Sequence, residues 1–349
     1  MPIERQSGEV RSDRYAEFCR LAERNGIESL LMAIGSSRPD PTVLSAALAA
    51  TGSRMKFMVA CRAGLISPAY FVQQINTLGS LTGGRVHVNI VLGHTPHELR
   101  YYGDFLTHDE RIQRTDEFLS ICRDYWTGGG AVDFEGEHYR VQAGRVRTPF
   151  TPFTPFGPSR PEIYIGGSSE SVARLATKHA DCLWRFPDTL DNIGKVATSL
   201  EGKSLGLLLS LITRPTAKEA WDAAHALLRN RSDEAAATQR QFRERSDSVG
   251  FRAVYDLAAS TQAAATLESP PENPAAPCLW AGAVPYLGSP SIALVGSFEE
   301  IRDALFVYRS VGVSQFLFMG WPDEAEVEYF GQGVLPLVRA REAALEQIA

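Results

Sequence analysis

The sequence has few cysteines, and none in the spacings that bind zinc or build a disulfide framework. The 349 residues contain five, far apart, at Cys19, Cys61, Cys122, Cys182 and Cys278. None belongs to a Cys-x-x-Cys pair, which argues against the common zinc and redox motifs. Because their neighbours are mostly apolar, we expect buried or half-buried free thiols and a reducing, cytoplasmic location.

Long apolar runs and basic runs are also missing. No apolar stretch approaches the roughly 20 residues that cross a bilayer, and residues 1–14 are polar, without a signal-peptide core. The formal net charge is −6, and no run of lysine and arginine suits a nucleic acid backbone. The seven histidines lack ligand spacing, since His94 and His97 lie three apart without a third ligand nearby. We therefore expect no membrane span, no nucleic acid partner and no metal.

What the sequence does contain is an alternation of short apolar runs with longer amphipathic stretches. Apolar residues make up 44% and charged residues 22%, as in an ordinary soluble globular protein. The alternation is typical of βα units around a parallel sheet. It predicts seven strands, near positions 28, 57, 88, 163, 183, 208 and 316.

The fold class that this pattern predicts is α/β, a (β/α)8-type TIM barrel in one domain over residues 1–349. An eight-stranded barrel needs one more strand, before the helix predicted at Tyr15–Asn25. Residues 1–14 are polar and charged throughout, so we expect the first strand to be absent or degenerate. Two insertions are predicted, a hairpin with a proline-rich connection at about 131–161 and a helical, mobile stretch at about 229–277.

A glycine-serine turn, from Gly166 to Glu170, follows the strand predicted at 162–165 and opens a helix. Gly166 and Gly167 let the backbone approach a ligand, and Ser168 and Ser169 offer hydroxyls and amides. The helix that begins there directs its positive end toward an anion. In α/β barrels, ligands bind at this carboxyl end of the strands. The turn predicts a phosphate site, although an ordinary serine-capped turn explains the same residues.

Segments along most of the chain resemble the luciferase-like flavin monooxygenases. They lie in order between about Tyr15 and Val338, and they look most like the two-component alkanesulfonate monooxygenases. The segments are 55–60, 67–68, 83–91, 105–111, 132–138, 166–170, 279–282, 293–296 and 320–322. The resemblance implies a luciferase-like barrel that binds reduced FMN from a separate flavin reductase and uses O2 to oxygenate a small molecule. The matching cofactor positions would be Asn89, Gly93, Gly166, Gly167, Ser168 and Ser169.

The polar groups of the alkanesulfonate monooxygenases are largely replaced. Their cysteine after the second barrel strand corresponds to Arg38, and their Arg-x-His pair to Leu208 and Ser210. The arginine of their mobile loop falls near Leu287, and their late tyrosine and histidine at Trp321 and Asp323. Leucines do not bind a tetrahedral anion, and a serine is no base near neutral pH. We therefore expect a substrate other than a sulfonate, in a pocket lined by Leu208, Leu287 and Trp321.

No catalytic residue is identified by these patterns, but three are candidates. Arg62 follows the third barrel strand and could face the flavin, or form a surface ion pair. His94 sits just past Gly93 and could handle protons, or be a solvated loop histidine. Trp321 could stack on a ring, or pack at the barrel end.

Two hypotheses of function follow. In the first, the chain is a two-component monooxygenase of a small organic molecule, as in natural-product tailoring. In the second, it is a non-catalytic flavin-binding or partner subunit of a luciferase-like heterodimer. A barrel short of one strand exposes sheet edges, so we expect a homodimer or a heterodimer with a homologous chain.

Overall fold

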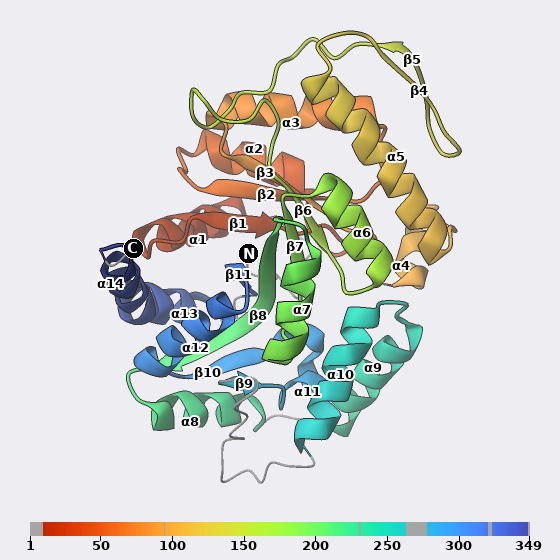
Figure 1. The fold of residues 1–349 in the computed structure, drawn as a ribbon. Coiled ribbons are helices and arrows are strands. Elements are labelled where there is room, and N and C mark those ends of the chain that lie inside the picture. The colour runs from red at the N-terminus through yellow and green to blue at the C-terminus, as the bar shows by residue number, and fades with distance from the viewer. Residues whose placement is uncertain (1–9, 94, 230–231, 263–277, 320–322, 348–349) are drawn as a thin grey trace. The chain divides into compact units, whose positions relative to one another are not determined.

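The computed structural model describes residues 10–93, 95–229, 232–262, 278–319 and 323–347 (Figure 1). They form two compact units. The first comprises Met1–Glu23, Glu28–Gly166 and Glu170–Leu183, and the second Arg24–Ile27, Gly167–Ser169 and Trp184–Ala349. The chain therefore passes from one unit to the other within strand β7, Cys182–Arg185.

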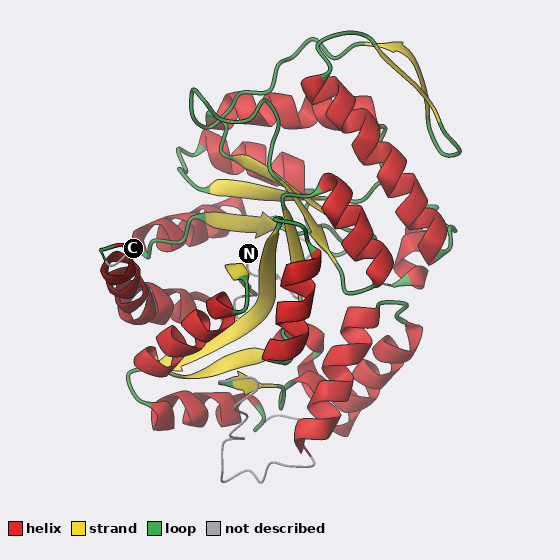
Figure 2. Cartoon of the chain, in the orientation of Figure 1, coloured by secondary structure: helices red, strands yellow, loops and turns green. Residues whose placement is uncertain are grey.

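The first unit is built on a parallel sheet in the order β1, β2, β3, β6 and the start of β7. These strands are β1 Ser29–Met32, β2 Lys56–Cys61, β3 Val86–Ile90 and β6 Ile163–Gly166. Six helices accompany them, α1 Ser12–Arg24, α2 Pro41–Ala50, α3 Pro68–Thr82, α4 Pro96–Tyr101, α5 His108–Thr127 and α6 Glu170–His179 (Figure 2). Apolar strand residues such as Val59, Val88 and Ile163 pair across the sheet and are fully buried.

Local sequence signals explain where two of these helices begin. The Ser67 hydroxyl accepts a hydrogen bond from the amide of Tyr70, and Pro68 occupies the first position of α3. Thr107 and Glu110 form a reciprocal capping box at the start of α5. Both helix starts satisfy amides that would otherwise lack partners.

An antiparallel hairpin lies at the edge of the first unit (Figure 1). Its strands are β4 Val132–Glu135 and β5 Arg140–Gly144, which confirms the hairpin expected in this stretch. The buried carboxylate of Glu117 on α5 accepts hydrogen bonds from the amides of Glu137, His138 and Tyr139, at 2.8, 2.9 and 3.0 Å. These three bonds fasten the hairpin tip to α5.

The second unit continues with the end of β7 and then β8, β10 and β9, while β11 also pairs with β8. The strands are β8 Ser204–Arg214, β9 Leu279–Trp280, β10 Ala293–Ser297 and β11 Val313–Phe318. The helices include α7 Leu190–Ser199, α8 Ala217–Leu227, α9 Asp233–Arg245, α10 Val249–Gln262, α11 Val284–Leu287, α12 Phe298–Ser310, α13 Asp323–Tyr329 and α14 Leu335–Glu346. A short 3-10 turn at Ser289–Ser291 and a π-helical stretch at Phe330–Val334 complete the unit.

All seven predicted strands are present, and the described residues add β9 and β10, which the sequence did not reveal. The reason lies in β8, which is 11 residues long. Its first half pairs with β11 and its second half with β10, both in parallel. The partner of the second half is the five-residue strand β10, which the apolar pattern did not single out.

The remaining expectations about organisation lie partly outside the described residues. Among the described residues no strand precedes α1, which begins at Ser12. Residues 1–9 lie outside the described part of the chain. The predicted insertion at 229–277 contains α9 and α10, and residues 263–277 lie outside. A single domain over 1–349 stays a prediction. Among the described helices, none combines the length and the apolar character required to span a membrane.

Candidate functional site

Asn89 lies near the carboxyl end of β3, where βα proteins bind ligands. In the sheet it pairs with Ala60 of β2 and Tyr164 of β6. Its side chain is buried, with 6% of the residue exposed, and Oδ1 has no hydrogen-bond partner among the described residues. A buried acceptor without a protein partner needs an explanation, and a bound ligand is one of them.

Arg62 directly follows β2 and lies on the same side of the sheet as Ala60, because side chains alternate along a strand. Its side chain is only 5% exposed, so the ion pair that it forms with Glu98 is not at the surface. Nη2 lies 3.8 Å from Oε2 of Glu98, and the guanidinium carbon lies 5.4 Å from the ring centre of Tyr102. Nε and Nη1 have no hydrogen-bond partner within the described chain.

Glu98, on α4, joins this arginine to the loop after β1. Its Oε1 accepts a hydrogen bond from the Ser36 amide at 2.8 Å, while Oε2 faces Arg62. Arg38 of the same loop is half-buried, and burial lowers its pKa despite the charge of Glu98. The loop therefore brings a second guanidinium toward the carboxyl end of the sheet.

Gly93 ends the segment after β3 in a conformation that favours glycine. Its φ is 77°, and a Cβ at this position would lie 2.6 Å from Cδ2 of Leu99. The absence of a side chain thus lets α4 pack closely against this segment. This is a structural reason for the glycine, and its contact with a cofactor stays a prediction.

Arg111, on α5, holds the same segment. This buried side chain donates from Nε to the Leu92 carbonyl at 3.1 Å and from Nη1 to the Leu106 carbonyl at 2.9 Å. The two bonds connect the end of β3 with the start of α5. The sequence contained no signal for this role beyond the charged residues around the helix start.

The predicted phosphate turn is divided between the units. Gly166, in the first, ends β6, and nothing lies within 4 Å of a Cβ built on it. Gly167, in the second, has a φ of 157°, and its amide donates to the Trp184 carbonyl at 3.1 Å. Ser168 and Ser169 are half-buried. A Cβ on Gly250 of α10 would lie 2.6 Å from the Ser168 Oγ, so this hydroxyl packs against α10.

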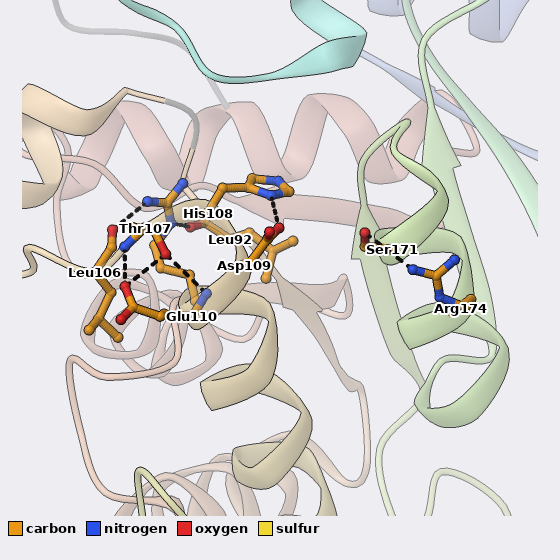
Figure 3. Close-up of polar contacts among 9 residues, drawn as sticks. Leu92, Leu106, Thr107, His108, Asp109, Glu110, Ser171 and Arg174 are labelled. Atoms are coloured by element: carbon orange, nitrogen blue, oxygen red, sulfur yellow. Dashed lines mark hydrogen bonds and ion pairs between the residues drawn. The ribbon is translucent and has the colours of Figure 1, made fainter.

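Helix α6 begins at Glu170, one residue later than predicted. Glu170 places a negative charge in the first turn, where it stabilises the helix but disfavours a second anion. Arg174 lies 2.5 Å from it and also approaches the Ser171 hydroxyl at 3.5 Å (Figure 3). The exposed arginine therefore offsets the charge of Glu170 beside the turn.

Known proteins share both the sequence pattern and the architecture. The model of the luciferase-like monooxygenase family matches residues 2–315. Riboflavin lyase (RcaE), with modified FMN and the substrate riboflavin, superimposes with a TM-score of 0.75 and 18% identity, covering 95% of this chain and 85% of the lyase. EDTA monooxygenase (EmoA) from Chelativorans sp. BNC1 gives 0.71 and 17%, over 95% and 87% of the two chains.

A third similar structure is the oxygenating constituent of 3,6-diketocamphane monooxygenase from Pseudomonas putida, in complex with FMN. It has a TM-score of 0.64 and 18% identity, and the match covers 96% of each chain. The family model spans most of the sequence, and this decides the assignment. The chain belongs to the luciferase-like monooxygenase family.

Membership places the chain among flavin-dependent monooxygenases and related oxidoreductases, and it confirms the predicted α/β fold of the TIM-barrel type. Within the described residues, the last strand in the order of each unit does not pair with the first, so neither unit is a closed barrel by itself. The family assignment does not itself identify the substrate.

Ser210 stands where the alkanesulfonate monooxygenases have the histidine of their Arg-x-His pair, and it is fully buried. The residue is 1% exposed, and its hydroxyl donates to the Pro290 carbonyl at 2.8 Å. Leu208, half-buried, pairs with Leu317 of β11. Leu287 ends α11 and is 36% exposed. Their place in a substrate pocket stays a prediction.

Two candidate residues, His94 and Trp321, lie outside the described residues, and Asp323 is the first residue of α13. All five cysteines are free, as expected, and four of them are buried. Burial raises the pKa of Cys61 to about 12, with the charge of Asp40 adding to the effect, so this thiol is no nucleophile near neutral pH. Among the described residues, no three histidine, cysteine or acidic side chains are grouped to hold a metal ion.

Proposed function

We propose that this chain binds FMN, receives it in the reduced state from a separate flavin reductase, and uses O2 to oxygenate a small organic substrate. The observation that carries the proposal is Arg62. A guanidinium that is removed from solvent, with two nitrogens lacking protein partners, has an energetic reason to bind a ligand.

The residues of the first unit fit a flavin ring chemically. The ring carries carbonyl and nitrogen acceptors together with an N–H donor. Arg62 offers N–H groups, and Asn89 offers an acceptor without a protein partner. The positive charge of Arg62 favours an anionic reduced ring over a neutral oxidised one, since a cation near a flavin tunes its electronic properties. The proposed contacts of the flavin are therefore Asn89, Gly93 and Arg62.

We assign the FMN phosphate to Gly166, Gly167, Ser168 and Ser169. The open side of Gly166 and the φ of Gly167 support a close backbone approach. The start of α6 supplies amides directed at an anion. The Ser168 hydroxyl packs against α10.

Bound FMN would supply the electrons that activate dioxygen. Around it, Arg62 would hold the ring and stabilise its negative charge, and Glu98 would orient Arg62 while fixed by the Ser36 amide. The Ser210 hydroxyl donates its hydrogen bond to the Pro290 carbonyl, so the proposal gives it no part in proton transfer. Leucine stands at positions 208 and 287, where the alkanesulfonate monooxygenases have arginines, so the proposed substrate is uncharged or apolar, as in natural-product tailoring.

The enclosed Ser210 also supports the second hypothesis, a non-catalytic flavin-binding or partner subunit. A chain with no base at this position could bind FMN and yet depend on a homologous chain for turnover. We further propose that the protein forms a dimer, with itself or with such a chain. In the first unit β1 stands at the end of the strand order, where a parallel sheet is open to pairing or cover.

Anaerobic titration of the purified chain with reduced and oxidised FMN tests the flavin assignment. We expect the reduced form to bind more tightly, at micromolar or weaker affinity. Absence of binding of both forms, or preference for a 5-deazaflavin, would overturn it. A coupled assay with a flavin reductase, NADH, O2 and candidate apolar substrates then separates the hypotheses. An oxygenated product supports the monooxygenase, whereas product formed only when a homologous chain is added supports the partner subunit.

A further inference from the structure

A cavity of about 440 Å³ lies within the first unit, apart from the residues assigned to FMN. Its lining comes from the loop after β2, the connection between α4 and α5, helix α5 and the hairpin tip. The side chains that matter to its chemistry are Asp104, Phe105, Arg114, His138 and Tyr139. The volume is within the range of sites that bind small organic ligands.

The one carboxylate of this cavity is already engaged. Asp104 Oδ2 accepts a hydrogen bond from Arg114 Nη2 at 2.5 Å, and Oδ1 accepts one from the Leu106 amide at 3.2 Å. Burial has the largest single effect on Asp104 and by itself would raise its pKa. The hydrogen bonds from Arg114 and the Leu106 amide, together with the charges of Arg114 and Arg111, outweigh burial and leave the pKa below its ordinary value. Asp104 is therefore ionised at neutral pH and has no need of a cationic ligand.

The groups left over are mainly donors. Arg114 Nε and the Tyr139 hydroxyl are buried without a hydrogen-bond partner in the described chain, and so is Nε2 of His138, which can donate in one tautomer. The Gly64 amide faces the Tyr139 oxygen, but their geometry falls short of a hydrogen bond. Donors without acceptors favour a ligand that brings acceptor oxygens.

The lining is held in place before any ligand arrives. Glu117 fixes the backbone amides of His138 and Tyr139, and the Tyr139 ring packs against Phe118 at 6.0 Å between ring centres. Arg114 lies directly over Gly64, whose φ is 97° and where a Cβ would overlap the guanidinium. Little ordering entropy remains to be lost on binding, which favours a specific site.

An apolar surface completes the cavity. Phe105 is 75% exposed, and Leu106 lies beside it in the lining. An aromatic ring this exposed, next to buried donors, suits a ligand with an apolar body and a polar head. We infer that the cavity binds a small aromatic carboxylate, with the carboxylate toward Arg114 and Tyr139 and the ring against Phe105.

The experiment uses the full chain, saturated with FMN, and 4-fluorobenzoate observed by 19F NMR, with 4-fluorobenzyl alcohol as the uncharged comparison. We expect the carboxylate to bind at least tenfold more tightly than the alcohol. Tyr139→Phe should weaken carboxylate binding by roughly tenfold or slightly more, the effect of one hydrogen bond to a charged group at its lower end. It should leave the melting temperature unchanged, because the hydroxyl has no protein partner to lose.

Two further variants locate the probe. Phe105→Ala should weaken 4-fluorobenzoate binding but leave that of the ringless fluoroacetate unchanged. Tyr70→Phe, on α3 and outside the lining, is the matched control and should change nothing. Equal binding of acid and alcohol, an unchanged affinity in Tyr139→Phe, or displacement of the probe by FMN would each overturn the inference. None of these outcomes depends on whether the chain oxygenates a substrate.

Discussion

The guanidinium of Arg62 lies 3.8 Å from the carboxylate of Glu98, and both side chains are largely withdrawn from solvent. Glu98 is also fixed by the amide of Ser36, so the arginine is positioned by a group that is itself held. A charge pair at this separation leaves guanidinium nitrogens available, which distinguishes it from a closed, bidentate ion pair. The proposed flavin site rests on this relationship.

Replacing Arg62 by alanine should weaken the binding of reduced FMN by about 1.5–3 kcal/mol, the usual cost of losing hydrogen bonds to a charged group. Oxidised FMN should lose less, because its ring is neutral. Anaerobic fluorescence titration of both forms measures the difference. Arg54→Ala removes an exposed arginine of the same unit and serves as the control. Equal losses for both redox forms would contradict a role in stabilising ring charge.

Replacing Ser168 and Ser169 together by alanine should weaken FMN binding by about 1–3 kcal/mol. The Ser168 hydroxyl packs against Gly250 of α10, so the two serines need not contribute equally. Isothermal titration of the two single variants separates them. Ser171→Ala, at the second residue of α6, should have no effect. An unchanged affinity in the double variant would show that the phosphate binds elsewhere.

Gly93→Ala should destabilise the protein by more than Gly52→Ala. Both glycines have a positive φ, 77° and 86°, so both variants bear the backbone cost of about 1–2 kcal/mol. A Cβ at position 52 meets nothing within 4 Å, whereas one at 93 would press on Leu99. Urea midpoints of the two variants isolate the contact. Similar midpoints would show that Leu99 moves aside for the new Cβ without a loss of stability.

The stability of the first unit should fall as the pH drops below 6.5 because of His179 on α6. Burial lowers the pKa of this histidine, and the bond to Asp116 at 2.6 Å offsets only part of the effect. Because the pKa of His179 is lower in the folded state, the unfolded chain binds the proton at a higher pH than the folded chain does. Stability is therefore complete above 6.5 and declines as the pH falls through the lower folded value.

The measurement is the urea midpoint at pH 7.5 and 5.5 for the native chain and for His179→Gln. The glutamine can still bond to Asp116 but does not titrate, so its midpoint should change less between the two pH values. Asp116, whose pKa is also lowered by its bonds to Lys178 and His179 against the effect of burial, contributes only near and below pH 3.8. An identical pH response in both proteins would exclude His179 as its source.

Much of the architecture was predictable because its signals are local. Apolar runs placed seven strands, and a hairpin was expected within residues 131–161. The strand β10 was missed because only the unusual length of β8 calls for it, and the pairing joins residues about 80 positions apart. Periodicity within a short segment carries no information about such a partner.

The sequence by itself determined the order of strands and helices, the glycine-serine turn and the family resemblance, since each depends on residues close together in the chain. Only the tertiary structure decided that Arg62 is buried beside Glu98, that Ser210 donates to Pro290, and that Ser168 packs against α10. The physical reason is the same in each case. Burial and hydrogen bonding depend on which distant segments the fold brings together, and a side chain's chemistry follows from those neighbours.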